Sequence, residues 1–268
     1  MARAIIEVSH LTKKFGDGTV AVNDISFSVA EGGIFAFLGP NGAGKSTTIQ
    51  MLTTILKPTA GTIRLGGTDI VSDPSTVRKM FGVIFQDPTL DDELTAFENL
   101  EFHGVLYGIA RAERRARIEK MLAFVDMSKR RNDFVKNFSG GMKRRLEIAR
   151  GLLHHPRVLF LDEPTAGLDP QTRNHLWDSL REMNRTEGVT IFFTTHYIEE
   201  AERAAKDIVI IDHGKIVASG TADSLKKETQ ATTLEEAFLA LTGKAIREEE
   251  GSATDHLRMM RRAYSAHR

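Results

Sequence analysis

A glycine-rich segment between an apolar run and a helical pattern constrains the fold of this chain more than any other feature. The segment follows the apolar run Gly33–Leu38 and reads Gly39-Pro40-Asn41-Gly42-Ala43-Gly44-Lys45-Ser46. It matches G-x-x-x-x-G-K-[ST] at every fixed position, and a helical pattern runs from Lys45 to about Leu56. A strand, a glycine-rich loop and a helix in this order predict a phosphate-binding loop in an α/β protein.

The residue types of this loop suit the binding of a nucleoside triphosphate. Glycines allow successive backbone N–H groups to point at an anion, because no Cβ stands in the way. The N-terminus of the following helix adds further N–H donors. We expect Lys45 to contact the β- and γ-phosphates and the Ser46 hydroxyl to bind Mg²⁺. The predicted nucleotide-binding residues of this segment are Gly39, Pro40, Asn41, Gly42, Ala43, Gly44, Lys45, Ser46 and Thr47.

A second apolar strand, Val158–Leu161, ends in the two carboxylates of Asp162 and Glu163. A buried strand of this kind places the residues that follow it at the carboxyl edge of the sheet, where α/β proteins bind ligands. We expect Asp162 to hold Mg²⁺, through water, and Glu163 to be the base that activates the attacking water. On its own this pattern is weak, but after a phosphate loop it becomes strong.

Short apolar strands alternate with helical patterns, which predicts a parallel or mixed sheet with helices on its faces. The first segments, Ala4–Val8 and Val20–Val29, indicate an antiparallel β region. We expect one domain at 1–243, with a helical insertion at about 87–155, and a charged tail at 244–268. Besides those already named, the predicted elements are strands at Met80–Phe85, Val189–Thr194, Asp207–Ile211 and within Gly214–Gly220, and helices at Leu94–Gly108, Arg111–Val125, Gly140–His154, Pro170–Arg185 and Leu234–Leu241.

Composition narrows the possible partners and the compartment. Lys and Arg total 36 and Asp and Glu total 36, and this zero net charge argues against a nucleic-acid binder. The absence of cysteine excludes disulfides and thiolate chemistry. No apolar run approaches the roughly 18 residues that span a bilayer, and the N-terminus does not match a signal peptide. A cytoplasmic α/β protein is therefore expected.

Basic runs and a histidine pair have simple structural explanations. The runs Arg111–Arg117, Lys129–Arg131 and Lys143–Arg145 are typical of solvated helix faces. The pair His154-His155 closes a helical pattern, where the helix dipole explains two histidines better than a metal does.

The segment Asn137-Phe138-Ser139-Gly140-Gly141-Met142 opens the helix that precedes Val158–Leu161. It resembles the Leu-Ser-Gly-Gly-Gln signature of the ATP-binding-cassette (ABC) ATPases. Phe138 and Met142 depart from that consensus, whereas Ser139, Gly140 and Gly141, which contact phosphate in the family, are retained.

Further motifs follow in the family's order over roughly 4–243. The resemblance implies that Phe15 stacks on adenine and that Gln86 contacts Mg²⁺ and the lytic water. Asp169 ends Ala166-Gly167-Leu168-Asp169, which is similar to the family's D-loop, and is implied to bind nucleotide. His196 matches the switch histidine that contacts the γ-phosphate. The implied catalytic residues are Glu163, His196, Lys45 and Gln86, and the implied metal ligands are Ser46, Gln86 and Asp162.

The resemblance implies a P-loop ATPase that works as a dimer, in which two cassettes enclose two ATP molecules head to tail. In the family, the helical insertion after the Gln86 position docks on a membrane permease. Several segments look like the daunorubicin-resistance-type exporter ATPases, which drive export of drugs, lipids or polysaccharides: Phe85–Asp91, Ser139–Arg150, Leu168–Trp177, Thr194–Glu202 and Leu234–Gly243. We expect a peripheral position on the inner face of the cell membrane.

Two other functions compete with this one. A non-transport ABC ATPase could act on ribosomes or nucleic acid, but such proteins typically carry two cassettes or a long coiled-coil insertion. A scaffold that binds nucleotide without hydrolysing it would not need catalytic residues. The presence of Glu163, His196 and Gln86 argues against that function.

Overall fold

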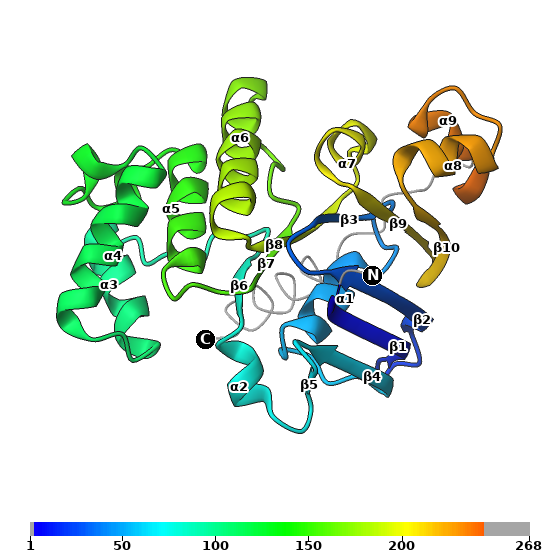
Figure 1. Cartoon of the computed structure of the whole chain (residues 1–268), viewed down its shortest axis with the longest axis horizontal. Helices are drawn as coiled ribbons and strands as arrows, with labels where there is room; N and C mark the ends of the chain where they lie inside the picture. Colours follow the sequence, from blue (N-terminus) through cyan, green and yellow to red (C-terminus); the bar gives the residue numbers. More distant parts are fainter. Residues whose placement is uncertain (1–2, 244–268) are drawn as a thin grey trace, which may run out of the picture.

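Two sheets form the framework of the chain (Figure 1). The computed structural model describes residues 3–243, and the tail at 244–268 lies outside the described residues. The larger sheet has six strands, in the order β10 (Lys215–Gly220), β9 (Asp207–Asp212), β3 (Ile34–Leu38), β8 (Thr190–Thr195), β7 (Val158–Asp162) and β6 (Phe81–Ile84). Strands β9 to β6 are parallel and β10 is antiparallel to β9, which confirms the predicted mixed sheet.

The smaller sheet is antiparallel and contains the N-terminal strands, as predicted. Its order is β2 (Val20–Ala30), β1 (Ala4–Lys14), β4 (Ala60–Leu65) and β5 (Thr68–Asp69). Strands β4 and β5 and the short helix α2 (Pro74–Arg78) were not predicted from the sequence. Strand β4 buries only Ile63 and Leu65 and begins with Ala60 and Gly61, so its apolar pattern is too short to detect.

Helices cover the larger sheet and build the region between β6 and β7. That region contains α3 (Ala96–Leu106), α4 (Arg111–Phe124) and α5 (Gly140–Leu152), seen on the left of Figure 1. The other helices are α1 (Lys45–Leu52), α6 (Pro170–Glu187), α7 (Ile198–Ala204), α8 (Ala222–Glu228) and α9 (Leu234–Thr242). Two of them, α7 and α8, have seven residues each and were not predicted. Among residues 3–243, no helix combines the length and the apolar character that crossing a membrane requires.

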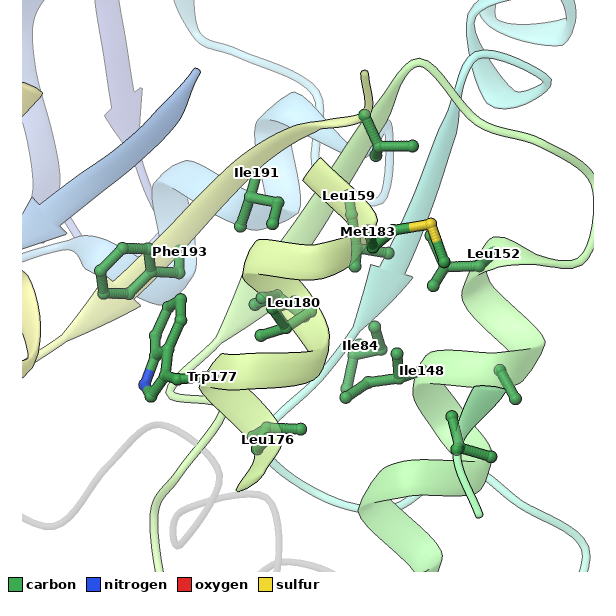
Figure 2. Packing of buried hydrophobic residues seen from close by; sticks show 14 of the residues in the cluster. Ile84, Ile148, Leu152, Leu159, Leu176, Trp177, Leu180, Met183, Ile191 and Phe193 are labelled. Carbon is green, nitrogen blue, oxygen red and sulfur yellow. The ribbon is translucent and has the colours of Figure 1, made fainter. Parts of the chain in front are cut away.

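The parallel strands are buried on both faces and divide the core in two. In β3, Phe35 and Phe37 point to the face shared with the small sheet, whereas Ala36 and Leu38 point to the helices. On the helical face, Trp177, Leu180 and Met183 of α6 pack beside the strands (Figure 2). This double burial explains why the strands are continuous apolar runs and why they were predictable.

Helix α5 lies directly against the edge strand β6. A Cβ on Gly82 of β6 would stand 2.1 Å from the carbonyl oxygen of Gly151 in α5. A Cβ on Gly151 would stand 3.3 Å from the side chain of Ile84. The two glycines thus permit backbone-to-backbone contact between the helical region and the sheet.

The dipole interpretation of His154 is wrong. Helix α5 ends at Leu152, and His154 lies half-buried beyond it, where its Nε2 is 2.9 Å from the carbonyl oxygen of Phe81. Its ring stacks on Tyr107 with centroids 3.9 Å apart. Burial lowers the pKa of His154 to about 4, so the ring is neutral at pH 7. Within residues 3–243, no group of three or more His, Cys, Asp or Glu is placed to hold a metal ion.

Because His154 is neutral in the folded chain, we expect the free energy of unfolding to fall in acid. Because the pKa of His154 is about 4 when folded and 6.5 in the reference state, the unfolded chain binds more protons between those values. Acidification from pH 6.5 to pH 4 should therefore lower the free energy of unfolding, with about 1 to 3 kcal/mol of the loss due to His154. Urea unfolding of the wild type and of His154→Gln should show a flatter pH dependence for the variant. Parallel curves would contradict this assignment.

Candidate nucleotide-binding and catalytic site

The glycine-rich loop joins β3 to α1 in a conformation that only glycine adopts easily. Gly42 and Gly44 have φ angles of 75° and 102°, in the left-handed region. A Cβ on Gly39 would lie 2.4 Å from the carbonyl oxygen of Ile211, and one on Gly44 would lie 2.4 Å from that of Ala21. No side chain caps the N-terminus of α1, so its N–H groups are available to an anion.

Lys45 is held inside this loop and is only 5% exposed. Its Nζ donates to the carbonyl oxygens of Gly39, at 2.9 Å, and Pro40, at 3.1 Å. The same Nζ lies 3.3 Å from Oε1 of Glu163. Burial lowers the pKa of Lys45, and the charge of Glu163 opposes that shift. The ammonium group therefore lies where two carbonyl oxygens of the loop and a carboxylate converge.

The carboxylate of Asp162 is linked to the start of α1 and to the neighbouring strand. Asp162 Oδ1 accepts hydrogen bonds from the hydroxyls of Thr194, at 2.6 Å, and Ser46, at 3.3 Å. Burial raises the pKa of Asp162, and these two hydroxyls oppose the shift. The register of β7 on β8 pairs Asp162 with Thr194, which brings these groups to the same edge of the sheet.

Glu163 adopts a left-handed backbone conformation, with φ of 46°. Its N–H donates to Oγ1 of Thr194 at 3.0 Å, and its Oε1 lies 3.1 Å from Nδ1 of His196. Burial acts to raise the pKa of Glu163, but the close contact with His196 and the charge of Lys45 outweigh it. The pKa of Glu163 therefore lies below its ordinary value, and the carboxylate is ionised and able to accept a proton.

Lys45, Asp162, Glu163, Thr194 and His196 form the buried cluster of the site, and the other predicted residues lie outside it. Gln86 is exposed just after β6, whose Ile84 pairs with Leu161 of β7. Phe15 is exposed in the turn between β1 and β2. Asp169 caps α6, accepting from the N–H of Thr172 at 3.0 Å and from its hydroxyl at 2.6 Å.

The signature segment begins helix α5. Ser139 is the N-cap residue, and its Oγ accepts from the N–H of Met142 at 3.3 Å. Ser139 and Gly140 are exposed, and a Cβ on Gly140 would meet no atom within 4 Å. Phe138 is 7% exposed and belongs to the core, so its departure from the consensus preserves an apolar role.

Sequence reasoning missed two polar residues of this region. Thr194 ends a predicted strand and has no predicted role, although its hydroxyl bonds to both Asp162 and Glu163. The solvated-face interpretation of Lys143–Arg145 is wrong for Arg144, which is 7% exposed. A basic residue five positions after Ser139 gives no sign in the sequence that it turns inward.

A glycine-rich loop between a strand and a helix, beside a strand that ends in Asp and Glu, defines a P-loop nucleoside triphosphatase. The family model described as "ABC transporter" matches residues 22–166. The daunorubicin/doxorubicin resistance ATP-binding protein DrrA of Streptomyces peucetius is 43% identical over 229 residues, which cover 85% of this chain and 69% of that protein.

Two further comparisons agree. The Nod factor export ATP-binding protein I of Paraburkholderia xenovorans (strain LB400) is 44% identical over 84% of this chain and 73% of its own. A solved structure of an ATP-binding subunit of an ABC transporter superposes with a TM-score of 0.80 at 32% identity, covering 88% of this chain and 99% of that one. The chain belongs to the ABC transporter family and is an ATP-binding ATPase.

Proposed function

We propose that this ATPase works as a head-to-tail pair that powers export through a separate membrane permease. Each ATP would lie between the glycine-rich loop of one chain and the N-terminus of α5 of the other. The head-to-tail pair is supported by the position of the phosphate-binding groups on two separate surfaces. Lys45 is buried among loop and strand residues, whereas Ser139 and Gly140 are exposed at a helix N-terminus. An exposed helix N-terminus with glycines suits the γ-phosphate of a second nucleotide.

The residues of the buried cluster and the predicted residues outside it take the following roles. Glu163 accepts a proton from the attacking water, and His196 holds the carboxylate of Glu163 and reaches the γ-phosphate. Lys45 neutralises phosphate charge, and Gln86 orients the water. Loss of the γ-phosphate weakens the contact with α5 of the partner, so hydrolysis opens the pair. Phe15 would stack on adenine, and Asp169 would contact nucleotide across the pair.

Mg²⁺ fits the donor set at the start of α1. Ser46 Oγ and Asp162 Oδ1 are 3.3 Å apart, and hydroxyl and carboxylate oxygens are the ligands that Mg²⁺ prefers. Gln86 offers a third oxygen. When bound, the ion neutralises charge on the β- and γ-phosphates.

Export is supported by the names of two relatives, one for drug resistance and one for Nod factor export. A drug, a lipid or a polysaccharide is the proposed class of substrate, and the cytoplasmic face of the cell membrane is the proposed location. A role on ribosomes or nucleic acid is not favoured. Purification of the full chain from membranes should capture a membrane protein that stimulates its ATP hydrolysis. Purification with ribosomes or nucleic acid alone would overturn the proposal.

Helix α3 carries exposed apolar side chains that support a permease partner. Phe102, Val105 and Leu106 are 61%, 52% and 66% exposed. We expect Phe102→Glu with Leu106→Glu to lower co-purification with the permease about tenfold or more, because apolar anchors dominate interface energies. Basal ATP hydrolysis should be unchanged. The matched control is Val71→Glu, which alters another exposed apolar residue, 50% exposed, and should purify like the wild type. An equal loss in the Val71→Glu control would contradict a specific role of α3.

A further inference from the structure

The guanidinium group of Arg144 lies against the end of strand β7. Its Nε donates to the carbonyl oxygen of Pro164 at 2.8 Å, and its Nη2 lies 3.2 Å from the carbonyl oxygens of Asp162 and Glu163. Three successive backbone carbonyls thus face one buried cation. Hydrogen bonds from a charged donor are among the stronger ones in proteins, so this side chain fixes the backbone that it contacts.

The same guanidinium reaches the segment that carries Gln86. Nη1 of Arg144 donates to the carbonyl oxygen of Phe85 at 2.5 Å and to Glu147 Oε2 at 3.3 Å. Glu147 is 1% exposed, and its other carboxylate oxygen accepts from the N–H of Thr89 at 2.8 Å. Side chains of α5 therefore hold both ends of 85–89, on either side of Gln86.

The backbone of Glu163 depends on such support. A φ of 46° is unfavourable for a residue with a Cβ and persists only where the surroundings determine it. The N–H of Glu163 donates to Thr194 at 3.0 Å, and its carbonyl oxygen accepts from Arg144 and from the N–H of Ala166 at 3.2 Å. Arg144 is the member of this set that comes from the helical region between β6 and β7.

We propose that Arg144 is a positioning residue through which helix α5 controls Glu163 and Gln86 of its own chain. Arg144 lies five residues after Ser139, the N-cap of the same helix. This inference rests on the proposed head-to-tail pair, in which the N-terminus of α5 binds the partner's ATP. When that ATP binds, it fixes the position of α5. Arg144 on α5 then fixes Glu163 and the segment of Gln86 beside the ATP that is bound to the glycine-rich loop of the same chain. Arg144 thereby couples the two ATP sites.

The first test is Arg144→Lys in the purified full chain. Lysine keeps the positive charge beside Glu147. It lacks the planar guanidinium group that donates to the carbonyl oxygens of Phe85 and of residues 162–164 at the same time. We expect kcat to fall about 100-fold, because small misplacement of catalytic groups costs about that much, while KM for ATP changes by less than about twofold. The Hill coefficient for ATP should fall to about 1. Hydrogen exchange of the amides at 85–89, excluding Pro88, should also become faster.

A matched control and a second variant separate positioning from folding. Arg145→Lys changes the next residue of α5, whose Nη1 donates to the carbonyl oxygen of Val125 at 3.2 Å, and should behave like the wild type. The double variant Arg144→Gln with Glu147→Gln removes both charges of the buried pair, so neither is left alone. It should show the same fall in kcat and in the Hill coefficient as Arg144→Lys, with a melting transition that confirms folding.

Folded Arg144 variants with a wild-type kcat would overturn the proposal. A lower kcat with an unchanged Hill coefficient would also overturn it, because Arg144 would not couple the sites. Size-exclusion chromatography of Glu163→Gln with ATP tests the pair separately. If no ATP-dependent dimer forms, both the head-to-tail pair and the coupling are contradicted. If the dimer forms but the Arg144 variants keep the wild-type Hill coefficient, only the coupling is contradicted.

Discussion

Glu163→Gln should reduce ATP hydrolysis about 10³-fold, within the range of a general base, and should leave ATP binding intact. Glutamine has the shape of glutamate but cannot accept a proton from water. Its side-chain oxygen can occupy the position of Oε1, which lies 3.3 Å from Lys45 Nζ and 3.1 Å from His196 Nδ1. Because the γ-phosphate is not removed, the ATP-bound pair should accumulate. Steady-state ATP hydrolysis and light scattering with and without ATP measure the two effects.

Glu187→Gln is the matched control for this prediction. Glu187 ends α6 and pairs with Lys120 at 2.7 Å, without contact to the buried cluster. Its variant should hydrolyse ATP at the wild-type rate and should not accumulate as an ATP-bound dimer. Unchanged turnover in Glu163→Gln would remove Glu163 from the role of base.

Two inactive variants should restore activity when they are mixed. Lys45→Ala removes the cation of the glycine-rich loop, and Gly140→Glu places a negative side chain where the proposed γ-phosphate contact lies. A Cβ on Gly140 meets no atom within 4 Å, so this change fits the folded chain. Each variant alone should lose about 10³-fold in ATP hydrolysis. In a mixed pair, the Gly140→Glu chain supplies an intact loop and the Lys45→Ala chain an intact α5.

Equal mixing gives half mixed pairs, each with one complete site, so about a quarter of the wild-type rate is the upper limit, reached if the sites act independently, and coupling through Arg144 lowers the recovery. In the control, Lys45→Ala is mixed with the double variant that carries both Lys45→Ala and Gly140→Glu. No complete site can form in this mixture, because neither chain has Lys45. The mixture should be assayed after ATP-driven assembly and at increasing total concentration. A mixture that shows neither recovery above the control nor an ATP-dependent dimer at any concentration would contradict the head-to-tail pair.

The buried cluster was predictable because its residues follow apolar strands directly. Lys45 and Ser46 occupy fixed positions in a local motif, and Asp162 and Glu163 end a strand that is buried on both faces. Parallel register then brings these positions to one edge of the sheet. Such features depend on sequence spacing and on the geometry of a sheet, and both can be read from one chain.

Other features depend on contacts between distant segments and could not be predicted. Arg144 looked like a solvated basic residue, because the carbonyls that it contacts come from Phe85 and from 162–164. His154 looked like the end of a helix, because the rings and the carbonyl that surround it lie far away in sequence. Strand β4 buries too few residues to show a period. Burial of a polar side chain is a property of the assembled fold.

The glycine contact between α5 and β6 determines how displacement passes through the molecule. Gly82 and Gly151 place two backbones together with no layer of side chains between them. Side-chain layers can rearrange their rotamers and absorb a shift, but a backbone contact has no such freedom. We therefore expect α5 and β6, which ends two residues before Gln86, to move as one unit. A methyl group at either glycine would separate α5 from β6, and we expect the helices and the sheet then to move independently of each other.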